Sequence, residues 1–312
     1  MKIDLFEEIY RIVRQVPRGK VSTYGAVARA LGDIRASRAV GVAMNINPDP
    51  EFTPCYRIVN SDGTVGGFSM GVDEKIRRLK EDGIEVVNGR IKDFERVFFD
   101  DFFARYPLKS LREEQIRLSR RVVLDNSFEK DELVAGVDVA YSRKNKRLAC
   151  AACVVMDKNL NIVEQKWLID EVNFPYIPTY LAYRELPIIA KIIQKLEQKP
   201  DILMVDGNGI LHPFGMGIAS HIGVVMDIPT IGVAKGLLCG EEKNGIITIN
   251  GSLSGYALHH SKKPIFVSPG HRVSAETALK IVKHFLRYRL PEPIRHAHIL
   301  ARFKIAEIDR RT

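Results

Sequence analysis

The sequence of 312 residues contains no long hydrophobic run. A membrane-spanning helix needs about 18 consecutive apolar residues, so none is expected here. Residues 1–16 carry acidic side chains within their apolar pattern and lack a small-residue cleavage site, so they do not resemble a signal peptide. We therefore expect a cytoplasmic protein without a membrane partner.

Cysteine is also scarce. Four cysteines in a chain of this length do not make a disulfide framework. Cys150 and Cys153 form a CxxC pair inside LACAACVVM, a stretch typical of a strand. In a strand this spacing directs the two thiols to opposite faces. The sequence has no second pair that would complete a zinc site. We predict that both cysteines are core residues.

The net charge of +9 is distributed unevenly. Residues 1–104 hold 16 basic and 16 acidic side chains, whereas residues 105–312 hold 31 basic and 22 acidic ones. A basic second half indicates a polyanionic partner, most simply a nucleic acid. The chain length and the ordinary hydrophobic content of 46% fit two domains, each with its own core.

Three short helices are expected at the start of the chain. Apolar residues at helical spacing predict an amphipathic helix over 5–16, and further helices follow over 24–31 and 36–44. Two short helices joined by a glycine-containing turn are typical of a helix-turn-helix. The third helix has nearly all small residues, which permits close approach to a DNA backbone and leaves Arg38 free to enter a groove or the base stack. The same small residues would also suit tight helix–helix packing.

Four sequence blocks in this half occur together: VPRGKVSTYGAVA, SRAVGVAMNINP, PCYRIV and GGFSMGVDEKIRRLKEDG. In this order, over residues 6–86, they resemble the O6-alkylguanine-DNA alkyltransferases. That family has a winged helix-turn-helix that flips an alkylated guanine and moves the alkyl group irreversibly onto a cysteine. The resemblance implies that Cys55 is the acceptor and that Arg38 fills the space of the flipped base. It also implies that Tyr24 presses on the flipping phosphate and that Asn47 braces the cysteine turn.

The first half departs from that family at the catalytic base. Tyr56 stands where the family has a histidine that polarises the thiol, and Asp82 stands at the position of a glutamate. A phenol with a pKa near 10 is a poor base at neutral pH, so thiolate formation would rest on the helix terminus and on Arg57. This change, and the lack of the family's usual amino-terminal domain, resemble the alkyltransferase-like proteins, which bind lesions without repair but replace the cysteine. We predict active transfer, with lesion binding alone as the alternative.

The second half is organised around the stretch from residue 201 to residue 235. An apolar run over 202–205 ends at Asp206, and the glycine-rich GNG follows at once. An acidic residue at the carboxyl end of a buried strand lies where open α/β sheets place ligand chemistry. A second strand-like run over 230–234 ends at Lys235, and His212 lies between the two runs. We expect Asp206, His212 and Lys235 to gather at one rim of a sheet.

Two further carboxylates accompany Asp206. Asp138 lies within the strand-like VAGVDVAYS, whose hairpin partner is RLACAACVVMD, and this arrangement is typical of the opening of RNase H-like nucleases. Glu185 begins an apolar-periodic helix after a proline-stiffened loop. Carboxylates are hard oxygen ligands for Mg²⁺, and a pair of such ions can hold both the attacking and the leaving oxygen of a phosphodiester. The three residues could meet only in the folded sheet, so their spacing alone leaves a metal site undecided.

The motifs around these carboxylates are more specific. GVDVAY, PYIP, YRELP, DGNG, PTIGVAK, SPGHR and RLPEPIR follow one another across residues 111–302 and resemble endonuclease V. That family is a metal-dependent endonuclease with an RNase H-like fold. It recognises deaminated bases, above all hypoxanthine in deoxyinosine, and cuts the second phosphodiester on the 3′ side of the lesion.

This resemblance implies a role for each motif. It implies that Mg²⁺ is held by Asp138, Glu185 and Asp206. Mn²⁺ can substitute for Mg²⁺. It further implies that His271 completes the active site and that Lys235 and His212 support phosphate or water. Tyr176, held between two prolines, would be the wedge that parts the strands, because a rigid aromatic ring can stack where the flipped base was.

Two departures from the endonuclease V pattern concern DNA binding. Phe214 lies in a motif where the family has a cation, and Thr179 stands where the wedge loop usually has glycine. We expect weaker binding of the DNA backbone. We expect the cleavage activity to be retained, since every proposed metal ligand is present.

The sequence therefore predicts a multi-domain α and α/β protein that fuses two DNA-repair activities. An alkyltransferase-like winged helix-turn-helix domain covers residues 1–92, a linker covers 93–107, and an RNase H-like α/β endonuclease V domain covers 108–312. The expected partners of this monomer are double-stranded and single-stranded DNA with deaminated or alkylated bases. Inosine in RNA is the alternative substrate of the nuclease.

Overall fold

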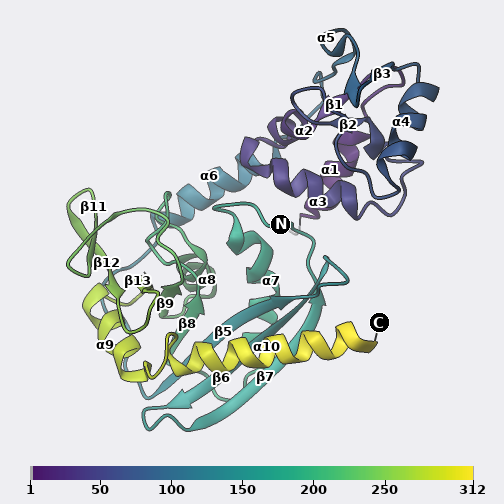
Figure 1. The fold of residues 1–312 in the computed structure, drawn as a ribbon. Coiled ribbons are helices and arrows are strands. Elements are labelled where there is room, and N and C mark those ends of the chain that lie inside the picture. Colours follow the sequence, from purple (N-terminus) through teal and green to yellow (C-terminus); the bar gives the residue numbers. More distant parts are fainter. Residues whose placement is uncertain (1–2, 312) are drawn as a thin grey trace. The chain divides into compact units, whose positions relative to one another are not determined.

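A computed structural model describes residues 3–311 (Figure 1). The chain forms two compact units, of which the first runs up to Arg112 and also includes Asn173–Pro178. The second unit consists of Glu113–Val172 and the chain from Thr179 onward. Among the described residues, no helix is both long and apolar enough to cross a membrane.

The first unit is mainly helical, and its strands are short. Asp4 accepts a hydrogen bond from the backbone N–H of Glu7 and so caps the first helix, and Thr23 caps the second helix in the same way. Gly32, at φ 103°, ends that second helix in the left-handed conformation that glycine favours. The elements in chain order are α1 (Leu5–Val13), β1 (Ser22–Thr23), α2 (Tyr24–Leu31), η1 (Ile34–Ala36), α3 (Ser37–Asn45), η2 (Cys55–Arg57), β2 (Ile58–Val59), α4 (Val72–Glu81), β3 (Val86–Val87), β4 (Arg90–Ile91) and α5 (Phe94–Val97).

The three helices predicted from the sequence are present, and the first ends three residues early. Helices α2 and α3 are joined through η1, as a helix-turn-helix requires. The predicted linker over 93–107 is partly structured, since it contains α5. The backbone of Val21 also pairs with it, donating to the carbonyl of Val97 and accepting from the N–H of Phe99.

The second unit is built on a nine-stranded sheet with the order β10-β11-β12-β13-β9-β8-β5-β6-β7. Strands β5, β8 and β9 are parallel, and β6, β7 and β13 are antiparallel to their neighbours. The elements from residue 107 onward begin with α6 (Pro107–Ser119), whose residues up to Arg112 belong to the first unit. The others are β5 (Leu133–Tyr141), β6 (Leu148–Asp157), β7 (Ile162–Glu171), α7 (Leu181–Ile193), β8 (Ile202–Asp206), α8 (Ile218–Met226), β9 (Thr230–Ala234), β10 (Glu241–Lys243), β11 (Ile246–Ile249), β12 (Ser252–Leu258), β13 (Ile265–His271), α9 (Ala275–Phe285) and α10 (Glu292–Arg311).

Helices cover both faces of this sheet. Helices α7 and α8 pack with one set of strand side chains, and α9 with the first part of α10 packs with the opposite set. Helix α10 continues along β5 and β6 (Figure 1). Strands β5, β6, β8 and β9 are therefore buried on both sides, which explains their continuous apolar sequences.

The two cysteines of the CxxC pair lie in this core, as predicted. Both are fully buried in β6. Cys150 packs with Ala301 and Ile305 of α10, whereas Cys153 packs in the cluster on the opposite face of the sheet. Burial raises the pKa of each thiol to about 12, which keeps both protonated and unreactive.

Candidate active sites

Two of the predicted metal ligands come from neighbouring parallel strands. Val137 of β5 pairs with Val205 of β8. Asp138 and Asp206 each follow the paired residue, so their carboxylates lie side by side where β8 ends. The registry of the parallel pair thus brings together two acids that are 68 residues apart in the chain.

The turn after Asp206 packs tightly because two of the residues involved are glycines, Gly209 in the turn and Gly232 in β9. A Cβ atom on Gly209 would lie 2.0 Å from the carbonyl oxygen of Pro269, and one on Gly232 would lie 2.2 Å from the nitrogen of Gly209. Both distances are far too short for any larger residue. The glycines of the DGNG and IGVAK motifs therefore allow the turn after Asp206 to pack directly on the backbones of β9 and β13.

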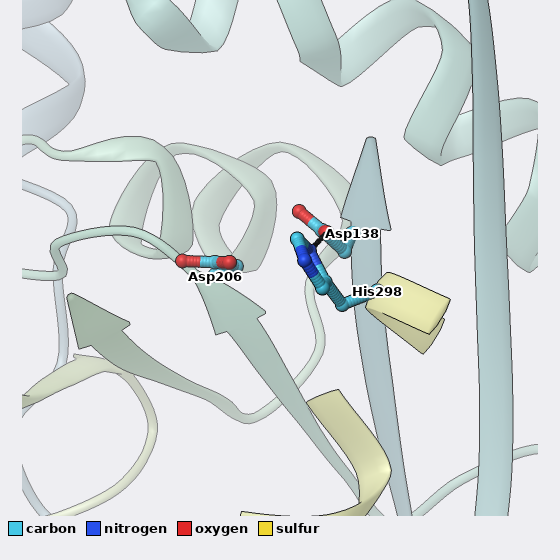
Figure 2. Close-up of side chains that lie close together, drawn as sticks. All are labelled: Asp138, Asp206 and His298. Atoms are coloured by element: carbon cyan, nitrogen blue, oxygen red, sulfur yellow. Dashed lines mark hydrogen bonds and ion pairs between the residues drawn. The ribbon is translucent and has the colours of Figure 1, made fainter. Parts of the chain in front are cut away.

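A histidine of the last helix completes the group. Nδ1 of His298 lies 2.6 Å from Oδ2 of Asp138. Ligand atoms of Asp138, Asp206 and His298 all lie within 4.8 Å of one another, and Figure 2 shows them converging from β5, β8 and α10. Two carboxylates and one imidazole at this separation are a donor set that suits a divalent cation.

Close packing of α10 on β5 puts this histidine in place. A Cβ atom on Gly136 would lie 2.1 Å from the carbonyl carbon of Pro293. Gly136 precedes Asp138 by two residues, and Pro293 lies in the first turn of α10, the helix that carries His298. The contact of backbone on backbone thus sets the approach of the histidine to the aspartate.

Glu185 lies beside the group on α7 and is only 8% exposed. The hydroxyl of Tyr141 donates a hydrogen bond of 2.7 Å to its Oε1. Burial, together with the charges of Asp138 and Asp206, raises the pKa of Glu185 to about 8, against the opposing effects of the Tyr141 hydrogen bond and the charge of Arg184. A third acid is therefore available next to the two aspartates.

Lys235 forms an ion pair with Oδ2 of Asp206. Burial and then the charge of Asp138 raise the pKa of Asp206, whereas Lys235 lowers it. The predicted meeting of these two residues at one rim of the sheet is confirmed. His212 follows Asp206 by six residues and is buried. Its Nδ1 accepts a hydrogen bond from the backbone N–H of Phe214.

The predicted role of His271 is wrong. His271 pairs with Thr230, the first residue of β9, and Thr230 pairs with Leu203 of β8. Asp206 pairs with Val233 near the other end of β9. The histidine and Asp206 therefore lie at opposite ends of this strand. Its Nδ1 accepts instead from the backbone N–H of Val123. His298 takes the place in the acidic group that was expected for His271.

The segment that carries the predicted wedge presents one aromatic ring to solvent. Tyr176 is 60% exposed, whereas Phe174 and Ile177 on either side are buried. Thr179 adopts φ 71°, a left-handed conformation that is rare outside glycine, in agreement with the glycine usual at this position. The buried flanks anchor the segment and leave the ring of Tyr176 free to stack.

The second candidate site surrounds Cys55 at the start of η2. The thiol is buried, and Nδ2 of Asn47 lies 3.1 Å from Sγ and 2.9 Å from the carbonyl oxygen of Thr53. Asn47 therefore donates both to the sulfur and to the turn that holds it. Burial raises the pKa of the thiol, and the Asn47 hydrogen bond together with the charges of Lys75 and Arg78 partly offsets this rise.

Tyr56 and Arg57 belong to a separate hydrogen-bonded group. The Tyr56 hydroxyl donates to Oδ2 of Asp82, and Nε of Arg57 donates to the same oxygen at 2.6 Å. Arg57 also donates to the carbonyl oxygen of Val16. The predicted support of the thiolate by Arg57 is therefore wrong, because its guanidinium is held by Asp82. The cations that favour the thiolate are Lys75 and Arg78.

Lys75 is 1% exposed, and its ammonium donates to the carbonyl oxygens of Ile58 and Gly67. Burial lowers its pKa to about 8, and the thiolate charge of Cys55 opposes this change. Among residues 3–311 this buried ammonium has only neutral carbonyl partners, so its charge is uncompensated and stabilises a nearby anion.

Tyr24 and Arg38 lie on the two helices of the helix-turn-helix. Tyr24 is half-buried and packs near Gly41, where an added Cβ would lie 3.9 Å from its ring. Burial and the charge of Cys55 raise the pKa of its hydroxyl. Arg38 is exposed on α3. The geometry leaves both predicted DNA contacts possible.

Comparison with known proteins adds two family matches. Residues 116–299 match the family described as "Endonuclease V", and residues 4–84 match "6-O-methylguanine DNA methyltransferase, DNA binding domain". A "Bifunctional methyltransferase/endonuclease" from Picrophilus torridus is 41% identical over 95% of both chains. The chain belongs to the bifunctional methyltransferase/endonuclease family. Its first part is an alkyltransferase DNA-binding domain and its second part has the RNase H-like α/β fold of endonuclease V, as the sequence predicted.

Solved endonuclease V structures agree with the fold of the second part of this family member. The catalytic domain of human endonuclease V is 32% identical with a TM-score of 0.60, over 65% of this chain and 97% of the human one. Endonuclease V of Ciona intestinalis, in complex with a DNA that contains an inosine followed by a ribo-adenosine, is 31% identical with a TM-score of 0.60, over 64% of this chain and 98% of that one.

Two residues of the nuclease site were not predicted from the sequence. His298 ends the motif RLPEPIRHAH, but its role depends on the return of α10 across β5. Tyr141 lies three residues after Asp138, and its contact with Glu185 depends on the packing of α7 on the sheet. A histidine inside a family motif was the available signal for the first, and the sequence held no comparable signal for the second.

Proposed function

We propose that this bifunctional methyltransferase/endonuclease repairs two kinds of DNA lesion. The nuclease part cuts the second phosphodiester 3′ to deoxyinosine and other deaminated bases, with Mg²⁺ or, in its place, Mn²⁺. The first part transfers the alkyl group of O6-alkylguanine to Cys55. The protein acts in the cytoplasm as a monomer. The observation that carries the nuclease proposal is the convergence of Asp138, Asp206 and His298.

The donor set fits a divalent cation. Asp138, Asp206 and Glu185 crowd negative charge into a largely buried space, and burial together with this crowding raises the pKa of the last two. A cation held by these carboxylates, with His298 beside them, would relieve that repulsion. When bound, Mg²⁺ supplies charge stabilisation at the phosphate and a water of lowered pKa.

The side chains around the acids have their own tasks in this proposal. Lys235 orients Asp206 through its ion pair and offers an ammonium at the rim where a phosphate would enter. Tyr141 holds the carboxylate of Glu185 in one orientation. His298 is held by Asp138 and is available for proton transfer at the reacting phosphate.

Support for a DNA substrate comes from the pairing of the two domains in one chain. The Ciona intestinalis relative was crystallised with a DNA in which a ribo-adenosine follows the inosine, so it supports recognition of inosine and does not favour DNA over RNA. The experiment uses matched 5′-labelled DNA and RNA duplexes that each contain one inosine, incubated with Mg²⁺. A single cut at the second bond 3′ to inosine, faster in DNA, agrees with the proposal. Faster cutting of RNA would instead support the RNA alternative, and no cutting of either would refute a nuclease.

Transfer at Cys55 requires the thiolate form of a cysteine that is held in a turn. In the proposed step Sγ attacks the alkyl carbon, the bond from that carbon to O6 breaks, and the electron pair remains on the guanine, which takes up one proton. The products are a thioether and guanine. Asn47 positions the sulfur, and Lys75 and Arg78 favour its anionic form.

A second candidate function for the first domain is lesion binding without transfer. Two observations favour it. Burial raises the pKa of the Cys55 thiol, and Tyr56 is engaged with Asp82, so no base lies in the place of the family's histidine. The mass of the Cys55 peptide after incubation with alkylated DNA distinguishes the two functions.

A further inference from the structure

A surface pocket of about 320 Å³ lies next to the nuclease site. It is bounded by the end of β5, the turn that follows and the last part of α10. Its lining residues are Tyr141, Arg143, Arg302, Ala306, Asp309 and Arg310. Three of these six side chains are guanidinium groups.

The pocket continues the face of α10 that carries His298. Arg302, Ala306 and Arg310 follow His298 at intervals of four residues, so all four lie on one side of the helix. Each interval advances about 6 Å along the axis. The first arginine is therefore one helical turn from the nuclease site.

The pocket also shares a wall with the site on the strand side. Tyr141 lies three residues after Asp138 on β5 and lines the pocket. Its hydroxyl is bonded to Glu185, and the guanidinium of Arg184 lies 4.0 Å from the centre of its ring. One tyrosine thus separates the arginines from the acidic group.

The arginines of the pocket are available to a ligand. Within residues 3–311, the guanidinium groups of Arg143, Arg302 and Arg310 form no ion pair or hydrogen bond, and all three residues are exposed. The one acid of the pocket, Asp309, uses both oxygens to hold the turn, accepting from the hydroxyl of Ser142 and from the backbone N–H of Arg143. These bonds keep the pKa of Asp309 below its ordinary value, so three positive charges face one negative charge.

We propose that this arginine pocket binds a phosphodiester of the DNA strand that the nuclease cuts, next to the scissile phosphate. The guanidinium group matches two phosphate oxygens at once, and arginine is suited to such recognition. Arg302 and Arg310 lie beyond residue 299, where the match to the endonuclease V family model ends. The proposal rests on the proposed nuclease function.

The test measures DNA binding without metal as a function of salt concentration. Each phosphate contact contributes about 0.9 to the slope of log affinity against log salt concentration, so Arg302→Ala/Arg310→Ala, which removes the contact with one phosphodiester, should lower that slope by about 1. The matched control is Lys195→Ala/Lys199→Ala, which removes the same charge from exposed positions after α7, on the other face of the sheet. The control should keep the parental slope, and Arg302→Lys/Arg310→Lys should also keep it because the charges remain.

A second measurement locates the contact. A deoxyinosine duplex with a single neutral methylphosphonate beside the cleavage position should bind the parental protein more weakly than the unmodified duplex, and this difference should vanish in Arg302→Ala/Arg310→Ala. Equal salt slopes for this variant and its control, or an undiminished methylphosphonate effect, would overturn the pocket. Nicking by the parental chain with Mg²⁺ is measured in parallel, and its absence would refute the nuclease function instead.

Discussion

Asp138 and His298 are separated by 160 residues, yet Nδ1 of the histidine lies 2.6 Å from Oδ2 of the aspartate. The contact joins the first strand of the nuclease sheet to its last helix. It identifies the histidine of the acidic group as one from α10. His271, which the resemblance in sequence had placed in the active site, lies at the other end of β9 from Asp206.

This relationship predicts opposite outcomes for two histidines. His298→Ala should lower the nicking rate on a deoxyinosine duplex about 10- to 100-fold, the range for loss of a group that supports a metal site. His271→Gln, which keeps an acceptor for the backbone of Val123, should retain the parental rate. Melting temperatures show that both variants fold. Equal loss of activity in the two variants would reassign the histidine.

The acidic group should serve only one of the two activities. Asp206→Asn removes a charged oxygen ligand, so nicking with Mg²⁺ should be abolished. Folding and the alkylation of Cys55 should be unchanged, because the substitution lies in the second unit. Nicking at the parental rate would show that the site has been assigned to the wrong residues.

Packing of α10 on β5 should be sensitive to a single methyl group. Gly136→Ala would place a Cβ 2.1 Å from the backbone of Pro293, so the helix must shift. We expect the free energy of unfolding to fall by about 1–3 kcal/mol, as for other overpacked sites, and nicking to fall with it. Urea denaturation measures the first effect. Gly236→Ala is the control, since its Cβ would meet open space and stability should change little.

The exposed ring of Tyr176 should act on duplex substrates. Tyr176→Ala should weaken the binding of a deoxyinosine duplex by about 1–3 kcal/mol, the range for the loss of one aromatic stack. A single-stranded substrate should lose less, because no partner strand has to be parted. Tyr176→Phe keeps the ring and should bind like the parent. The wedge is excluded if the alanine variant loses equal affinity for both substrates.

The alkyl transfer rate should depend on pH through the thiol. Burial raises the pKa of Cys55, so only a small fraction is thiolate at neutral pH, and below the pKa this fraction grows about tenfold per pH unit. The rate should therefore rise with pH across the neutral range. Tyr56→His should speed transfer at pH 7, because an imidazole with a pKa near 6.5 can accept the thiol proton. A rate that does not vary with pH would exclude thiolate formation as the limiting factor.

Much of this molecule could be predicted from the sequence, for identifiable reasons. The strands that carry Asp138 and Asp206 are buried on both faces, so their apolar runs, and the glycines that follow Asp206, could be recognised in the sequence. The helix-turn-helix follows from helical spacing and from Gly32, and the CxxC pair follows from strand alternation. These features depend on near neighbours in the chain.

The remaining features depend on the packing of distant elements. His298 reaches Asp138 because α10 crosses β5 at Gly136, and no local pattern encodes that crossing. Arg57, two residues after Cys55, was expected to support the thiolate, but Asp82, 25 residues away in sequence, holds its guanidinium. Proximity in sequence was a poor guide wherever an ion pair could form with another element.

The mass of the Cys55 peptide tests most directly whether one chain carries both activities. Excess protein is incubated with a duplex that contains O6-methylguanine and is then digested, with Cys55→Ser as the control. Transfer predicts a gain of about 14 Da on the Cys55 peptide, since one methyl group replaces one proton. The Cys55→Ser variant should show no gain while it still nicks deoxyinosine duplexes. An unchanged mass after long incubation at pH 8.5 would contradict transfer and leave the first domain as a binder of lesions.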